Sequence, residues 1–340
     1  MTLDVSGNYV VSQGVTQNYS EDTAIYISDG SVTNHGSLNN ISSGDQTRIL
    51  DGFASFIKNY GSLNVTNNNP NFFGAPAAAM VIASPVIENF GSITSTAASA
   101  IGIYAYDTSD ITNEGQISAN GRTNSMGVYY VLGGAFHNSG AIRSEASGPT
   151  SDYGAVGVQL TSGTAFYNSG TITAVDSSSE FTSLGVYTGG SSAVAEQIIQ
   201  NSGTIRADIA ISIEGTAAYK VVNSNLIDGA VMLASGNDTI VNTGRITGFI
   251  DLSEGDDIYQ GALAVGAVSV NGGDGADTLI GGAGGDLLIG GAGFDLLTGG
   301  AGVDTFQDTA AGLNGDRITD FSLGDRIVIT NASLSGFSAS

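Results

Sequence analysis

A nine-residue unit that occurs four times in succession constrains the fold of this chain more than any other feature. The unit reads G-G-x-G-x-D-x-U-x, where U is a large apolar residue, and its copies fill residues 272–307. Glycines permit a sharp backbone turn, and the end of each unit alternates like a short strand. One apolar side chain per unit cannot close a hydrophobic core alone, so the units must stack. We therefore expect a thin roll in which two units make one coil and these side chains point inward: Leu279, Leu288, Leu297 and Phe306.

Each unit also places one aspartate at the edge of its turn. With two units per coil, Asp277 stacks on Asp295, and Asp286 stacks on Asp304. Bare carboxylates in such a column repel each other. The unit offers carboxylate and carbonyl oxygens without histidine or cysteine, and these hard ligands favour Ca²⁺ over zinc or copper. The sequence therefore predicts calcium ions between consecutive turns.

A second repeat, Asn-x-Gly-x-(Ile or Leu), runs through residues 34–246 with copies 19 to 33 residues apart. Short strands in units of this length are typical of a parallel β-helix, in which stacked coils close the core. The asparagine amides of neighbouring coils can then hydrogen-bond along the axis. In one copy Asn225 replaces the glycine, and because asparagine tolerates positive φ, we expect a left-handed residue there. The copies begin at Asn34, Asn59, Asn89, Asn113, Asn138, Asn168, Asn201, Asn223 and Asn242.

A column of apolar-small-apolar triplets accompanies the asparagines. Alternation at period two predicts that Ile101 and Ile103 face the core while Gly102 and Tyr104 face outward. The triplets are Ile101-Gly102-Ile103, Met126-Gly127-Val128, Val156-Gly157-Val158, Leu184-Gly185-Val186 and Ile211-Ser212-Ile213.

Tyr104, Tyr129 and Tyr187 share one expected outward position next to these triplets. Their rings could stack on sugars, which would make glycans a partner; alternatively, tyrosine simply favours strands and covers backbone. Phe72 and Phe73, in a long insertion, are further candidates for binding, or fold back on the coil.

The two repeats merge without a Pro- or Ser-rich linker. The series Asp238, Asp257, Asp277 and Asp295 steps by 19, 20 and 18 residues, close to one coil each time. We expect one continuous solenoid whose coils shorten along the chain. Asp238 and Asp257 form a weaker or half site, or are ordinary turn aspartates, and Asp274 occupies a variable position. The expected divisions are a β-helix at 1–262, a calcium roll at 263–310 and a C-terminal cap at 311–340.

The repeat style of residues 20–260 resembles the β-helical passengers of bacterial autotransporters and filamentous-haemagglutinin-like surface proteins. Residues 272–307 resemble the calcium roll of RTX (repeats-in-toxin) proteins, which carry the hemolysin-type calcium-binding repeat. These resemblances imply an all-β chain, a right-handed parallel β-helix (β-solenoid) that runs into a C-terminal calcium-binding parallel β-roll.

In RTX proteins Ca²⁺ is held between stacked turns by the aspartate and by carbonyls of the Gly-rich turn. Carried over, this implies one site at Asp277 and Asp295 and another at Asp286 and Asp304. The segment NGDRITDF, residues 314–321, resembles the one that closes RTX rolls ahead of a type I secretion signal. The implied carbonyls lie around Gly273, Gly275, Gly291 and Gly293 for the first site and around Gly282, Gly284, Gly300 and Gly302 for the second.

Composition limits the classes of function. The net charge of −23 argues against nucleic acid and anionic membranes as partners, because both would be repelled. No apolar run approaches the ~20 residues of a membrane helix, and no N-terminal secretory signal is visible. No G-x-S-x-G or H-E-x-x-H motif occurs, and no aspartate cluster with a nearby cation stands out beyond the roll.

The sequence thus predicts a secreted or cell-surface calcium-binding β-solenoid with a structural or adhesive role rather than an enzyme. Extracellular calcium would fold it, and its expected partners are calcium ions, the type I secretion apparatus, and extracellular glycans or host-surface molecules. The alternative is a polysaccharide-modifying enzyme, a lyase or an epimerase, that carries an RTX module, since parallel β-helices include such enzymes.

Overall fold

A computed structural model gives the fold of most of the chain. Phe72 and Phe73 lie outside the described residues, as does the end of the expected cap, residues 332–340. The described residues are 3–20, 22–43, 47–69, 76–106, 110–130, 134–148, 154–161, 163–178, 182–190 and 197–331.

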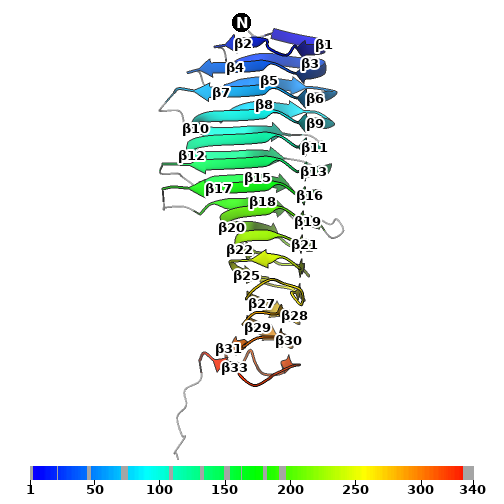
Figure 1. Cartoon of the computed structure of the whole chain (residues 1–340), viewed down its shortest axis with the longest axis vertical. Coiled ribbons are helices and arrows are strands. Elements are labelled where there is room, and N and C mark those ends of the chain that lie inside the picture. Colours follow the sequence, from blue (N-terminus) through cyan, green and yellow to red (C-terminus); the bar gives the residue numbers. More distant parts are fainter. Residues whose placement is uncertain are drawn as a thin grey trace, which may run out of the picture.

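The described chain forms one long ladder of short parallel strands (Figure 1). It comprises 33 strands, and none of the described residues is helical. Except at the ends of each side, every strand pairs in parallel with the equivalent strands one coil earlier and one coil later, as Ile93 does with Leu63 and Ile117. No helix long and apolar enough to cross a membrane is found in the part of the chain described. The predicted all-β solenoid is confirmed.

Each coil of the N-terminal part has strands on three sides. Side A follows the repeat asparagine, side B carries the apolar triplet, and side C ends at the next repeat asparagine. Side A alone holds β2 (Thr16–Tyr19), β4 (Ser37–Ser42), β7 (Ser62–Asn67), β14 (Ala141–Ala146), β17 (Thr171–Asp176) and β24 (Arg245–Ile246). Sides A and B share β10 (Ser92–Ala105), β12 (Gln116–Tyr130), β20 (Thr204–Gly215) and β22 (Leu226–Met232).

The other two sides continue to the C-terminal end of the described chain. Side B alone holds β5 (Arg48–Phe53), β8 (Ala77–Ala83), β15 (Ala155–Thr161), β18 (Leu184–Gly190), β25 (Phe249–Asp251), β27 (Ser269–Gly275), β29 (Leu287–Gly293), β31 (Thr305–Asp308) and β33 (Arg326–Ile329). Sides B and C share β1 (Leu3–Val11) and β3 (Thr23–Asn34). Side C alone holds β6 (Phe56–Asn59), β9 (Val86–Asn89), β11 (Asp110–Asn113), β13 (Gly134–Asn138), β16 (Thr164–Asn168), β19 (Gln197–Asn201), β21 (Tyr219–Asn223), β23 (Thr239–Asn242), β26 (Ile258–Gln260), β28 (Thr278–Gly282), β30 (Leu296–Gly300) and β32 (Arg317–Ile318).

The nine repeat asparagines form an unbroken amide ladder at the end of side C. From Asn34 to Asn242, each Nδ2 donates to the Oδ1 of the next asparagine at 2.7 to 2.8 Å. All nine side chains are buried, and the last amide donates to the Tyr259 hydroxyl at 3.2 Å. The predicted ladder is confirmed, and it fixes the register of every coil that it joins.

The glycine two residues after each asparagine serves close packing rather than a left-handed turn. Ser253 is the only non-glycine residue with positive φ in the described chain, so Asn225 is not left-handed, and neither are the glycines of this position. A Cβ at Gly61 would overlap the carbonyl oxygen of Gly36, and the same contact recurs from coil to coil. The expectation of positive φ was wrong because the carbonyl of the previous coil occupies the space of the missing side chain.

The small residue of each triplet also faces inward, against expectation. A Cβ at Gly102 would overlap Cγ2 of Ile117, a core residue on side A of the next coil. Ile101 packs instead on the outside with Tyr104, while Ile103 stays in the main core. The inward–outward alternation expected for the triplet therefore fails, because Ile117 of the next coil fills the space in front of Gly102.

The fifth triplet is shifted by two residues from its expected place. Leu184 pairs with Ile209, and Val186 pairs with Ile211, so the triplet is Ile209-Ala210-Ile211 and not Ile211-Ser212-Ile213. Tyr187 accordingly pairs with Ser212.

The coil narrows where side A ends. Its last strand, β24, pairs with β22 and has no successor among the described strands. The register step falls from 24 residues between Ile87 and Ile111 to 18 between Leu279 and Leu297. Figure 1 shows the resulting taper towards the C-terminal end. Strand pairing crosses both expected divisions, through β26 with β28 and β31 with β33, and the division into domains stays a prediction.

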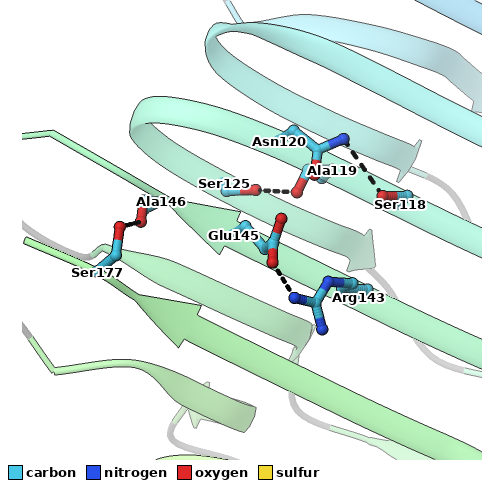
Figure 2. Close-up of polar contacts among 8 residues, drawn as sticks. All are labelled: Ser118, Ala119, Asn120, Ser125, Arg143, Glu145, Ala146 and Ser177. Carbon is cyan, nitrogen blue, oxygen red and sulfur yellow. Dashed lines mark hydrogen bonds and ion pairs between the residues drawn. The ribbon is translucent and has the colours of Figure 1, made fainter.

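Polar side chains on the outer surface bond within a strand or to the adjacent coil (Figure 2). Arg143 forms an ion pair with Glu145 on the same strand. The Ser177 hydroxyl donates to the carbonyl of Ala146 in the preceding coil at 3.1 Å. Such contacts satisfy polar groups on the surface of the β-helix. The charged turns of the roll differ from this surface in their chemistry.

Candidate metal centre

Two columns of aspartates follow the turns at the two ends of the roll's strands. The first column lies where side B turns into side C, and the second lies where side C turns back into side B. Asp277 N–H donates to Asp295 Oδ1 at 2.9 Å, and Asp286 N–H donates to Asp304 Oδ1 at 2.9 Å. The structure thus brings together the pairs of aspartates that the repeat spacing indicated.

The second carboxylate oxygen in the first column has no partner. Oδ2 of Asp277 and Oδ2 of Asp295 are buried and accept no hydrogen bond. A buried polar atom without a partner costs roughly 1–3 kcal/mol, and more when it carries charge. A divalent cation would satisfy both oxygens, so these residues fit calcium.

The turns around these carboxylates have the left-handed backbone that only glycine adopts readily. In the first column, φ is 110° and 151° at Gly273 and Gly275, and 104° and 154° at Gly291 and Gly293. No three His, Cys, Asp or Glu side chains of the described residues come together in a metal-holding group. A calcium ion in this column would therefore take much of its coordination from turn carbonyls.

The second column is less regular than the first. Gly300 and Gly302 have φ of 98° and 141°, whereas Gly282 and Gly284 do not have positive φ. The turn at 281–285 rests on the loop at 261–267, which has a different sequence, rather than on another nine-residue unit. Asp286 Oδ2 also accepts the N–H of Gly282 at 2.6 Å, so it is already satisfied.

The first glycine of each unit makes room for the aspartate, a role that the sequence analysis missed. A Cβ at Gly272 would overlap Asp277 Oδ2, and a Cβ at Gly290 would overlap Asp295 Oδ2. The same overlap would occur at Gly281 and Gly299. The signal was present in the invariable first position of the unit, but the sequence does not show that the aspartate five residues later fills the space.

Burial raises the pKa of three of the repeat carboxylates, those of Asp277, Asp286 and Asp295. The pKa of Asp277 rises to about 7, mainly because burial disfavours the charged form, with nearby aspartates adding to the shift. The pKa of Asp295 rises to about 6 and that of Asp286 also rises, in both cases mainly through burial. A bare carboxylate is therefore unfavourable at these positions, and a bound cation would restore its ionised form.

Comparison with known proteins agrees with this geometry. The chain matches the model of the RTX calcium-binding nonapeptide repeat, in four copies, over residues 266–288 and 271–306. Residues 266–306 are RTX repeats. RTX nonapeptide repeats bind calcium and are typical of secreted proteins. No curated protein and no solved structure matches the chain.

Both columns continue beyond the RTX repeats. Asp295 N–H donates to Asp316 Oδ1, and Asp304 N–H donates to Asp325 Oδ1, each at 3.0 Å. The sequence analysis placed Asp316 only in a closing segment and did not single out Asp325, although each follows its predecessor by 21 residues. Upstream, Asp238 and Asp257 belong to the first column.

Asp274 does not share this environment. Its side chain is exposed at the variable position of the turn, and only its backbone joins the stack, through bonds to the turn at 253–255. Asp274 therefore adds charge near the column without lying inside it.

Acidic and cationic side chains also meet in one hollow of about 390 Å³ beyond the roll. Asp176, Arg206, Asp208 and Asp228 line it, and the sequence analysis missed this cluster because the residues are far apart in the chain. Arg206 Nε donates to Asp228 Oδ2 at 2.7 Å, which lowers the pKa of Asp228. Asp208 Oδ2 accepts the hydroxyl of Ser183 at 2.7 Å. The bonds of Arg206, Asp208 and Asp228 join neighbouring coils, whereas Asp176 Oδ1 accepts from Ser178 in its own coil.

The tyrosine column does not present three free ring faces. Tyr104 and Tyr129 stack on each other with ring centroids 4.9 Å apart, so each covers a face of the other. Gln159 separates Tyr129 from Tyr187, whose hydroxyl donates to Glu214 at 2.9 Å. A strip of sugar-stacking faces is thus not formed by these residues.

Proposed function

We propose that this protein is an extracellular calcium-binding β-solenoid with a structural or adhesive role, and that calcium folds its C-terminal roll. The observation that carries the proposal is the pair of buried, unpartnered Oδ2 atoms on Asp277 and Asp295, within RTX repeats. Where these carboxylates are ionised, a fold that buries such oxygens with no donor for them needs a cation.

The ligands in this proposal come from consecutive turns. Asp277 and Asp295 hold the first ion, and Asp286 and Asp304 hold the second. The more regular turns of the first column, with four left-handed glycines, favour the first site as the tighter one. The proposed carbonyl donors are Gly273, Gly275, Gly291 and Gly293 for the first ion and Gly282, Gly284, Gly300 and Gly302 for the second.

Calcium would couple secretion to folding. Where calcium is scarce, the acidic turns repel one another and the roll stays open. Outside the cell, calcium neutralises the columns, and its binding free energy becomes folding free energy. The folded roll then covers the strand edges of the last three-sided coil. The secreted nature of RTX proteins and the segment at 314–321 support export by the type I route.

The structural or adhesive role draws on the shape and the surface of the molecule. Stacked coils form a long column, and such solenoids display extended surfaces to partners. His35, Tyr60 and Phe90 form a stack of rings at the equivalent turn of three successive coils, with centroids 4.8 and 4.9 Å apart, and Tyr60 and Phe90 are exposed. Their faces cover one another, as those of Tyr104 and Tyr129 do, so it is the exposed outer edges of this stack that we offer as a contact surface for extracellular glycans or host-surface molecules.

Circular dichroism of the whole chain, with and without calcium, tests the proposal. We expect β-sheet signal to be lost on chelation and regained on adding calcium. In Asp277→Asn/Asp295→Asn this response should shift to at least about tenfold higher calcium concentration. Asp274→Asn, which changes an exposed carboxylate of the same turn, is the matched control. A spectrum that ignores chelation, or equal responses of all three proteins, contradicts the proposal.

A further inference from the structure

Two aspartates upstream of the RTX repeats show the same unsatisfied oxygen. Asp238 and Asp257 are 1% and 0% exposed, and the Oδ2 atom of each accepts no hydrogen bond. Their Oδ1 atoms accept the N–H groups of Tyr219 at 2.7 Å and of Asp238 at 2.6 Å. Both residues lie outside the matched range 266–306, so the RTX match does not account for them.

The turn before Asp257 has the shape of an RTX turn although its sequence differs. Ser253 has φ of 76° where the next turn has Gly273 at 110°, and Gly255 has 145° where the next has Gly275 at 151°. A parallel bridge joins the residues between them in the two turns. A serine held in the left-handed region is strained, and such strain persists where surrounding structure or function demands it.

The turn before Asp238 continues the stack by one more coil. Gly236 has φ of 140°, and its N–H donates to the carbonyl of Glu254 at 2.8 Å. The carbonyl oxygen of Gly236 in turn points at the next turn, because a Cβ on Gly255 would overlap it. The same Cβ would lie 3.2 Å from Asp257 Oδ1, so a backbone carbonyl oxygen and a carboxylate oxygen meet beside Asp257.

Among the described residues, no cationic side chain forms an ion pair with these carboxylates. The ion pairs between described residues involve Asp51, Glu88, Glu145 and Asp228, and none involves the first column. Consecutive coils place the charges about 4.8 Å apart, where like charges repel strongly in a buried setting. The column thus needs a cation at these levels for the same reason as at the RTX repeats.

We propose that the calcium column begins at Asp238, with ions between Asp257 and Asp277 and between Asp238 and Asp257. This inference rests on the proposed function, because it extends the same column. The sites use degenerate turns, ASGND at 234–238 and LSEGD at 252–256 followed by Asp257, in place of the nine-residue unit. In this arrangement calcium also binds at the last three-sided coil. The stability of the C-terminal end of the β-helix then depends on calcium, as that of the roll does.

Counting bound ions in the intact chain tests this proposal. Native mass spectrometry, with equilibrium dialysis against Ca²⁺ as a second measurement, would compare the wild type with Asp238→Asn and Asp257→Asn. We expect the wild type to bind more ions than the two that the RTX repeats account for. Asp238→Asn should lose one ion, and Asp257→Asn should lose up to two. Asp256→Asn, an exposed neighbour with the same change of charge, should lose none.

Two outcomes separate the failure of this inference from the failure of the proposed function. If Asp238→Asn and Asp257→Asn both bind as many ions as the wild type while Asp295→Asn binds fewer, the column begins at Asp277 and the inference is overturned. If the wild type and Asp295→Asn both bind no calcium, the proposed function itself is contradicted, and the inference is overturned with it. Circular dichroism in saturating calcium checks that each variant is folded, since asparagine can replace the carboxylate in a neutral stack.

Discussion

The asparagine ladder of the β-helix and the aspartate column of the roll solve one structural problem with different chemistry. Both stack one polar side chain per coil at a corner of the solenoid. An asparagine amide carries a donor and an acceptor, so Asn138 donates to Asn168 and accepts from Asn113, each at 2.7 Å. An ionised aspartate only accepts, so Asp277 obtains one backbone N–H for Oδ1 and nothing for Oδ2.

This difference divides the molecule into a self-sufficient part and a dependent part. The ladder closes its own hydrogen bonds and needs nothing from the solvent. The column leaves one oxygen per coil open, so its stability depends on an ion that the environment supplies. The change occurs at Tyr259, whose hydroxyl accepts the last asparagine amide just where the coil loses side A.

Removing calcium should give the largest difference between the roll and the asparagine coils. In chelator at pH 8 we expect residues 269–329 to exchange their amide protons freely, because the aspartate columns repel themselves without an ion. The asparagine coils at 34–223 should keep their protection, because their ladder is complete. Hydrogen-exchange mass spectrometry with and without calcium measures both regions in one experiment. Magnesium is the control ion, since it demands a smaller and stricter oxygen shell.

Equal loss of protection in both regions would contradict this division of the molecule. So would full protection of the roll in chelator, because it would show that the buried oxygens are satisfied without a divalent ion.

Removing one rung of the ladder should destabilise the β-helix in a way that calcium cannot repair. Asn138→Ala leaves Asn113 without an acceptor and Asn168 without a donor, both buried. We expect a loss of about 2–4 kcal/mol in the free energy of unfolding, measured by urea denaturation with and without calcium. Ser139→Ala, at the exposed next position, should change it little. If added calcium restored the stability of Asn138→Ala, the asparagine ladder would also depend on calcium, which would contradict the comparison.

The pH dependence should differ in sign with and without calcium. Burial raises the pKa of Asp277 to about 7, above its unfolded value, so protonation stabilises the calcium-free roll. That stability is present below about pH 4 and is lost as the pH rises through 7. Calcium needs the ionised form, so between pH 8 and pH 6 its affinity at the first site should fall by about tenfold through Asp277 and by about twofold through Asp295, whose pKa is raised to about 6. Calcium titrations by circular dichroism at several pH values measure both trends, and affinity that is constant over this range contradicts them.

The sequence predicted the parts of the fold that depend on repetition. The spacing of the asparagines and of Asp277 and Asp295 was enough for the ladder, the column and the shortening coil. It failed where a glycine leaves space for another side chain: Gly102 faces Ile117 of the next coil, and Gly290 faces Asp295 of its own turn. Side-chain periodicity along one strand cannot show these contacts, because the residue that fills the space lies outside that strand.

The glycine at 290 therefore gives the finest test of how the column differs from the ladder. In Gly290→Ala the new Cβ would overlap Asp295 Oδ2 and push it from the position where it would meet an ion. We expect calcium affinity to fall by about tenfold while the β-helix is unaffected. Gly7→Ala, where a Cβ meets no atom within 4 Å, is the control for the loss of backbone freedom. Unchanged affinity in Gly290→Ala would show that this oxygen does not hold the ion, and would place the ligand set elsewhere in the turn.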